Sequence, residues 1–133
     1  MAERIFLSYV LQDRDLVDAV EQALREHKIV TAKDVVIVDQ ERDAPERENV
    51  TASRKTRIGS VRAADIRAKI KDQISSASKV VIIASNAAAL SPWVNYEAGM
   101  AAALGKPIVV IRKKGTGKNA LIAALENVRF IEI

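Results

Sequence analysis

The order of apolar and polar positions along the chain predicts strands that alternate with helices. Five runs rich in apolar, mostly β-branched residues are typical of strands buried on both faces. These runs lie at residues 4–9, 34–39, 79–85, 106–113 and 128–133. Between them, apolar residues recur at helical spacing, which predicts amphipathic helices. The predicted helices cover residues 13–27, 61–75, 92–104 and 117–127.

Strands and helices in this alternation form a parallel sheet that right-handed crossovers cover on both faces. We therefore expect an α/β fold, a flavodoxin-like three-layer sandwich whose five-stranded parallel sheet has the order 2-1-3-4-5. In that order the ligand crevice lies beyond the carboxyl ends of strands 1 and 3. Strand 1 ends at Ser8 and Tyr9, and strand 3 ends at Ser85 and Asn86. We expect these four residues to line a substrate site.

The helix that follows strand 3 has clear signals at both of its ends. Ser91 suits the N-cap, Pro92 suits the first helical position, and Gly105 suits the end of the helix. Between Val80 and Gly105 the only charged residue is Glu97, although 29% of the chain is charged. Either this carboxylate points to water from the edge of an apolar stripe, or it is buried for a function that offsets the cost of burial.

One segment, residues 40–60, has no periodicity and carries many charges of both signs. Connections longer than about 12 to 15 residues without regular structure are commonly lids, binding loops or disordered segments. Its basic residues, Arg57 among them, could contact a pyrophosphate or could form an ordinary solvated loop.

Composition narrows the classes of function. The chain has 133 residues, no cysteine and one histidine, so we expect a single domain over residues 1–133 and no metal site. The net charge of +4 is spread along the chain and aromatic residues are few, which argues against direct nucleic-acid binding. No apolar run reaches the ~20 residues of a membrane span, and no signal peptide is recognisable, so we expect a cytoplasmic protein without membrane contact.

The motif "RIFLSY" stands in the first strand, and "VVIIASNAAALSPWVNYEAGMAAALGKPIVVI" runs from the third strand to the fourth. The most specific part is the order Ser91, Trp93, Glu97, followed by a helix of small residues and "GKPIVVI". Together with the final strand, this pattern resembles a TIR (Toll/interleukin-1 receptor) domain of the bacterial type. The resemblance extends over nearly the whole chain.

The resemblance implies an NAD+ glycohydrolase or ADP-ribosyl cyclase that cleaves the nicotinamide–ribose bond, with NAD+ as substrate and no further cofactor. It implies that Glu97 is catalytic and faces the ribose, that Trp93 lies in the adjoining turn, and that Ser8 and Tyr9 line the pocket. The loop at residues 40–60 would cover the site or contact a neighbouring subunit. The resemblance also implies that the protein is activated by self-assembly, as a homo-oligomer or a head-to-tail TIR assembly. A sensor domain or partner protein could take part, and the role would be in bacterial defence signalling or virulence.

One carboxylate is enough for this reaction, because nicotinamide departs from a nitrogen that is already cationic and needs no general acid. Two alternatives remain. A non-enzymatic TIR adaptor would act by TIR–TIR interaction, and a nucleoside deoxyribosyltransferase-like enzyme would also carry a glutamate in a sequence such as "EAGMAAALGKP". Trp93 could stack on a flat ring or serve as a packing anchor between helix and sheet.

Overall fold

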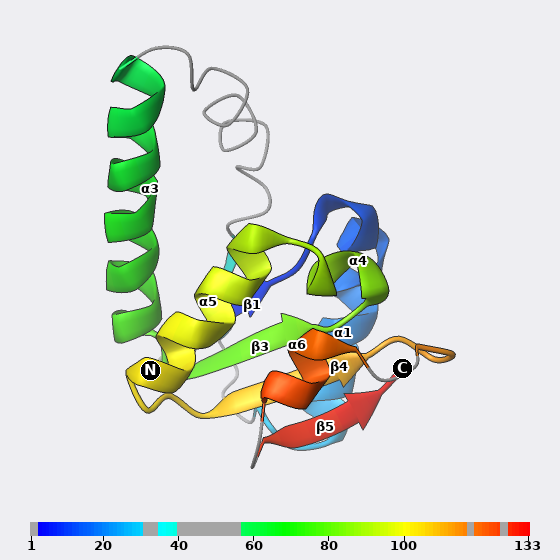
Figure 1. The fold of residues 1–133 in the computed structure, drawn as a ribbon. Helices are drawn as coiled ribbons and strands as arrows, with labels where there is room; N and C mark the ends of the chain where they lie inside the picture. The colour runs from blue at the N-terminus through cyan, green and yellow to red at the C-terminus, as the bar shows by residue number, and fades with distance from the viewer. Residues whose placement is uncertain (1–2, 31–34, 40–56, 117–118, 126–127) are drawn as a thin grey trace.

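The computed structural model describes residues 3–30, 35–39, 57–116, 119–125 and 128–133. Within these ranges, parallel strands form one five-stranded sheet. The strands are β1 (Glu3–Ser8), β2 (Val35–Asp39), β3 (Lys79–Ile83), β4 (Ile108–Arg112) and β5 (Arg129–Glu132). Their order is β2-β1-β3-β4-β5, which confirms the predicted flavodoxin-like α/β fold (Figure 1).

Helices cover both faces of this sheet. They are the 3-10 helix η1 (Leu11–Leu16), α1 (Val17–Glu26), α3 (Arg57–Ser76), α4 (Asn86–Ala89), α5 (Pro92–Ala103) and α6 (Ala120–Ala124). Helices α3, α4, α5 and α6 lie on one face of the sheet, and α1 lies on the other (Figure 1). Side chains of the first four share one apolar core with the sheet, and those of α1 share the other. In the described part of the chain, no helix is long and apolar enough to cross a membrane.

Side chains alternate between the two cores along each strand, as the pleat of a strand requires. Phe6, Ile82 and Val110 belong to the core beneath α3 and α5, whereas Leu7 and Ile83 belong to the core beneath α1. Because residues two apart on a strand point to the same face, Ser8 faces the same side as Phe6. The last residue of β1 is thereby aimed at α5.

Both ends of α5 lie where the sequence predicted them. The Ser91 hydroxyl oxygen accepts a hydrogen bond from the Val94 amide at 3.2 Å, and Pro92 begins the helix. At the other end Gly105 has a φ of +67°, in the left-handed region that favours glycine. The Lys106 amide then donates to the carbonyl oxygen of Ala101, which completes a Schellman motif.

The second predicted helix begins earlier than the sequence indicated. It was expected from residue 61, but α3 begins at Arg57, so residues 57–60 are helical and not part of the predicted loop. Gly59 and Ser60 lower helix propensity by at most about 1 kcal/mol each, a preference that the rest of a long helix overrides. The remainder of that predicted loop, residues 40–56, lies outside the described residues.

Three smaller differences concern helix boundaries. The segment predicted as one helix from residue 13 divides into η1 and α1. The predicted strand at residues 79–85 ends at Ile83, and a short helix that was not predicted, α4, follows it. The last helix was expected over residues 117–127, but Asn119 and Leu125 lie outside α6, while 117–118 and 126–127 lie outside the described residues.

A lysine fastens the end of α3 to the turn after α5. Lys106 Nζ donates hydrogen bonds to the carbonyl oxygens of Ser75, at 2.7 Å, and Ala77, at 3.0 Å. Hydrogen bonds from a charged donor are worth about 1.5 to 3 kcal/mol when buried and less when partly exposed. We therefore expect Lys106→Met to lower the free energy of unfolding by about 1 to 2 kcal/mol, measured by urea denaturation.

The exposed Lys113 provides the matched control for this substitution. We expect Lys113→Met to change the free energy of unfolding by less than about 0.5 kcal/mol, as is usual for surface substitutions. Equal losses for the two variants would contradict a specific role of Lys106 at the end of α3.

Candidate functional site

A buried hydrogen bond joins β1 to α5 at the carboxyl edge of the sheet. The hydroxyl group of Ser8 donates to Oε1 of Glu97 at 2.8 Å. Both residues have a relative exposure of 0%. The sequence left open whether Glu97 points to water or into the protein, and the structure answers that it is buried.

The burial of Glu97 follows from the helical spacing of its neighbours. Val94, Ala98 and Ala101 are buried at positions that share one face of α5, and Glu97 lies among them. This face packs onto the sheet in the core that also contains Phe6. A carboxylate is costly in such surroundings unless another group hydrogen-bonds to it. The Ser8 hydroxyl supplies a hydrogen bond of that kind.

A second buried carboxylate lies at the same edge. Ser85, the residue predicted to end strand 3, is the N-cap of α4, and its hydroxyl donates to Oδ2 of Asp13 at 2.5 Å. Asp13 lies in η1 and is buried, as is Ser85. The sequence analysis did not select Asp13. Its signal was present, since Asp13 is the first acidic residue after strand 1 and so lies near the carboxyl edge.

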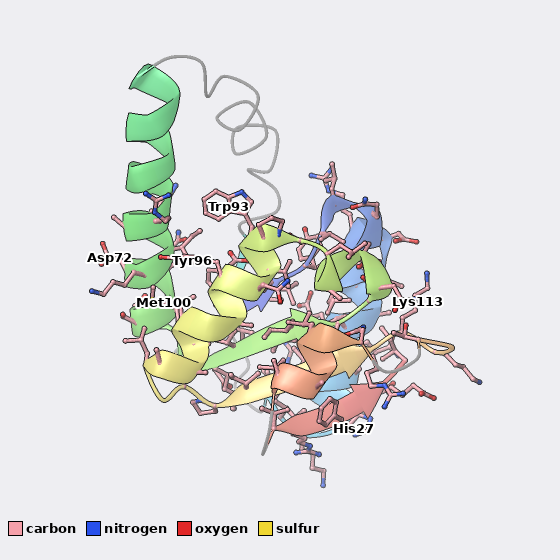
Figure 2. All side chains as sticks on the ribbon, in the orientation of Figure 1. His27, Asp72, Trp93, Tyr96, Met100 and Lys113 are labelled. Atoms are coloured by element: carbon pink, nitrogen blue, oxygen red, sulfur yellow. The ribbon has the colours of Figure 1, made fainter. Side chains whose placement is uncertain are left out.

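Trp93 precedes Glu97 by four residues on α5, so the two side chains leave neighbouring parts of the helix surface, about one turn apart. Trp93 is half-buried and meets Tyr96 edge to face, with ring centroids 6.1 Å apart and an interplanar angle of 85°. Figure 2 shows Trp93, Tyr96 and Met100 along the side of α5 that faces α3. All three pack against the core beneath these helices. Trp93 is therefore a partly exposed packing residue, whereas its stacking on a flat ring of the substrate stays a prediction.

Among the other predicted residues, Tyr9 is placed away from the Ser8–Glu97 pair. Tyr9 is fully buried in the core beneath α1, on the opposite face of the sheet from Ser8, because successive residues of an extended chain alternate. Asn86 is exposed as the first residue of α4. Arg57 is the first residue of α3, and its side chain lies outside the described part of the structure.

Metal ligands do not cluster in the described ranges. Among these residues, no group of three or more histidine, cysteine, aspartate or glutamate side chains is placed to hold a metal ion. The two buried pairs offer the chemistry of carboxylates and hydroxyl groups: a glutamate on α5 that accepts a hydrogen bond from a hydroxyl group, and a second carboxylate–hydroxyl pair between η1 and α4.

Comparison with solved structures agrees with this architecture. The chain is similar in fold to a Clostridium botulinum CMP N-glycosidase, BcmB, with a TM-score of 0.55 and 16% sequence identity. The similarity covers 98% of this chain and 89% of that one. None of the curated proteins matches the chain.

Comparison with protein families is more specific. The family described as "Thoeris protein ThsB, TIR-like domain" matches residues 6–118. These limits include both buried pairs, Ser8 with Glu97 and Asp13 with Ser85, together with Trp93. The match extends over most of the chain and confirms the resemblance to a bacterial TIR domain. The chain belongs to the family of ThsB TIR-like domains.

Proposed function

We propose that this protein cleaves the nicotinamide–ribose bond of NAD+, and that Glu97 is its catalytic residue. The observation that carries the proposal is the Ser8–Glu97 pair, a fully buried carboxylate held by a hydroxyl group at the carboxyl edge of the sheet. In open α/β sheets this edge, beside the point where the strand order reverses, is the usual place of a ligand site. Here the reversal falls between β1 and β3.

The reaction requires one well-placed negative charge from the protein and no general acid. As the C1′–N bond breaks, its electron pair moves to the ring nitrogen, and nicotinamide leaves as a neutral molecule. The ribosyl group passes through an oxocarbenium-like transition state, whose positive charge a nearby carboxylate stabilises. Water then adds to C1′ and loses a proton to give ADP-ribose, or a group of the same molecule adds and loses its proton to give a cyclic isomer.

Ser8 has a defined part in this proposal. Its hydroxyl group donates to Oε1 of Glu97, so it fixes the rotamer of the carboxylate before substrate arrives. A group that is already oriented needs no reorganisation during the reaction, which is the main source of electrostatic catalysis. Ser8, first expected to contact substrate, is therefore assigned as a positioning residue that acts through Glu97.

The fold similarity to a CMP N-glycosidase supports a second substrate class, the pyrimidine nucleoside monophosphates. Cytosine is a poor leaving group as an anion and must be protonated as its bond to ribose breaks, which calls for a general acid. In the described structure the Ser85 hydroxyl donates a hydrogen bond to the second buried carboxylate, that of Asp13, so this carboxylate oxygen acts there as an acceptor and not as a donor. This arrangement favours NAD+, whose leaving group requires no acid.

Assembly is part of the proposal, because TIR domains act through contacts with one another, and a non-enzymatic adaptor would form such contacts too. The enzyme and the adaptor would both self-associate, but only the enzyme would turn over NAD+. An adaptor has no use for a buried glutamate oriented by a hydroxyl group, so the Ser8–Glu97 pair favours the enzyme. We expect the rate per molecule to rise with protein concentration.

The test is to incubate the protein with NAD+ and, separately, with CMP over a range of protein concentrations, and to identify products by chromatography with mass detection. We expect release of nicotinamide from NAD+ and no release of cytosine from CMP. The mass of the second product distinguishes ADP-ribose from a cyclic isomer. If cytosine release from CMP were the only reaction, the substrate class would be nucleoside monophosphates and not NAD+. If neither substrate were cleaved at any protein concentration, the result would favour the non-enzymatic adaptor.

A further inference from the structure

The second buried pair lies where the strand order reverses, beyond the carboxyl ends of β1 and β3. Asp13 follows β1 and Ser85 follows β3, and these two strands are neighbours in the sheet. The hydrogen bond from the Ser85 hydroxyl to Asp13 joins residues 72 positions apart in the sequence. It therefore ties together the two segments that leave the sheet on either side of the proposed site.

The direction of the hydrogen bonds in this bridge is defined. Ser85 Oγ accepts a hydrogen bond from the backbone amide of Ala88 at 3.0 Å, and its single O–H donates a hydrogen bond to Oδ2 of Asp13. The Asp13 amide donates to the carbonyl oxygen of Val10 at 2.8 Å, which closes a tight turn directly after β1. The start of α4, Asp13 and Val10, the N-cap of η1, thus form one hydrogen-bonded unit.

This unit lies close to Ser8 along the chain. Val10, to which Asp13 is bonded, is two residues after Ser8 and belongs to the same core as α5. A shift of η1 away from α4 would therefore move the end of β1 and change the direction in which the Ser8 hydroxyl donates. The geometry of Ser8 sets the orientation of Glu97.

We propose that Asp13 is a positioning residue, which with Ser85 forms a clasp that holds the end of β1 so that Ser8 keeps Glu97 oriented for catalysis. The inference rests on the proposed function for its catalytic consequence. A contact that served only stability would not need a buried carboxylate, because well-packed apolar residues often replace a buried charge without loss of stability. A hydrogen bond to a carboxylate is roughly twice as strong as one between neutral groups and is restricted in direction, which suits a positioning role.

The kinetic test compares Asp13→Asn with Asp15→Asn, an exposed aspartate of the same short helix η1. We expect Asp13→Asn to lower kcat for NAD+ cleavage by about tenfold or more with KM changed less than about twofold, because a misplacement of about 1 Å can cost roughly 10²-fold in rate. Asp15→Asn should behave as the wild type. An unchanged kcat in Asp13→Asn would overturn the proposal.

The Ser8→Ala background tests whether Asp13 acts through Ser8. If it does, adding Asp13→Asn to Ser8→Ala causes no further loss, because the group that transmits the effect is already absent. Independent, multiplying losses would overturn the proposed route. Ser85→Thr, which keeps a hydroxyl group, should lose less of kcat than Ser85→Ala, and equal rates for these two variants would also count against the clasp.

Amide hydrogen exchange gives a readout that does not depend on turnover. In Asp13→Asn we expect faster exchange at residues 9–16 and 86–89, on both sides of the clasp, with the exchange of α3 unchanged. If the wild type cleaves no NAD+, the proposed function fails, and this measurement still decides whether the clasp exists. Unchanged exchange in both segments would overturn the clasp even in an active enzyme.

Discussion

Glu97→Gln should lower kcat for NAD+ cleavage by about 10²- to 10³-fold, the usual effect of removing one preorganised electrostatic group. Glutamine has the shape of glutamate and keeps an oxygen that can accept the hydrogen bond from Ser8, so the geometry of the pair is retained. The substitution removes the negative charge that, in the proposed reaction, stabilises the ribosyl cation. The measurement is the rate of nicotinamide release at saturating NAD+.

The same variant also separates a functional carboxylate from a structural one. A buried carboxylate lowers stability unless its hydrogen bonds offset desolvation, and residues retained for activity are commonly of this kind. We therefore expect the free energy of unfolding of Glu97→Gln to equal or exceed that of the wild type. The matched control is Glu132→Gln, at an exposed position on β5. Full activity in Glu97→Gln, or a stability loss above about 2 kcal/mol, would contradict the assignment.

Ile82→Ala should have the largest effect on stability among simple truncations near the site. Ile82 is fully buried on β3, where its neighbours in register are Ser8 on β1 and Val110 on β4. Removing a buried isoleucine side chain leaves a cavity and usually costs about 2 to 5 kcal/mol, a large part of the roughly 5 to 15 kcal/mol that stabilises a domain. Urea denaturation monitored by circular dichroism measures the loss.

Two further variants calibrate that result. Ile82→Val removes a single carbon atom and should cost about 0.5 to 1.5 kcal/mol. Leu90→Ala makes a similar truncation where the side chain is 85% exposed, and its effect should stay within about 0.5 kcal/mol. If Ile82→Ala were no more destabilising than Leu90→Ala, β3 would not be the central strand of the folded protein.

The elements with local signals were predicted well from the sequence. The apolar strands specified the sheet and its order, because a run of β-branched residues buried on both faces has few alternatives to a parallel sheet. The ends of α5 were also correct, since capping by Ser91 and the left-handed Gly105 depend on residues next to the helix ends.

Features that depend on contacts between residues far apart in the sequence were predicted less well. Tyr9 was expected beside Ser8, but the side-chain alternation at the end of β1 places it in the other core. Asp13 was not selected because its importance comes from Ser85, a residue that only the folded sheet brings near. The burial of Glu97 was undecided for a similar reason, as helical spacing does not reveal which face of an almost uniformly apolar helix meets the sheet.

The Ser8–Glu97 pair has a consequence for the order of events during folding. Its two residues are 89 positions apart, so the contact closes a long loop and gains nothing until β1 has paired with β3 and α5 has packed across them. Contacts of such long range form slowly and late, whereas the helices can form from local interactions. A chain that has formed most of its helical structure would still lack the oriented Glu97, so the proposed cleavage of NAD+ would require the completed sheet.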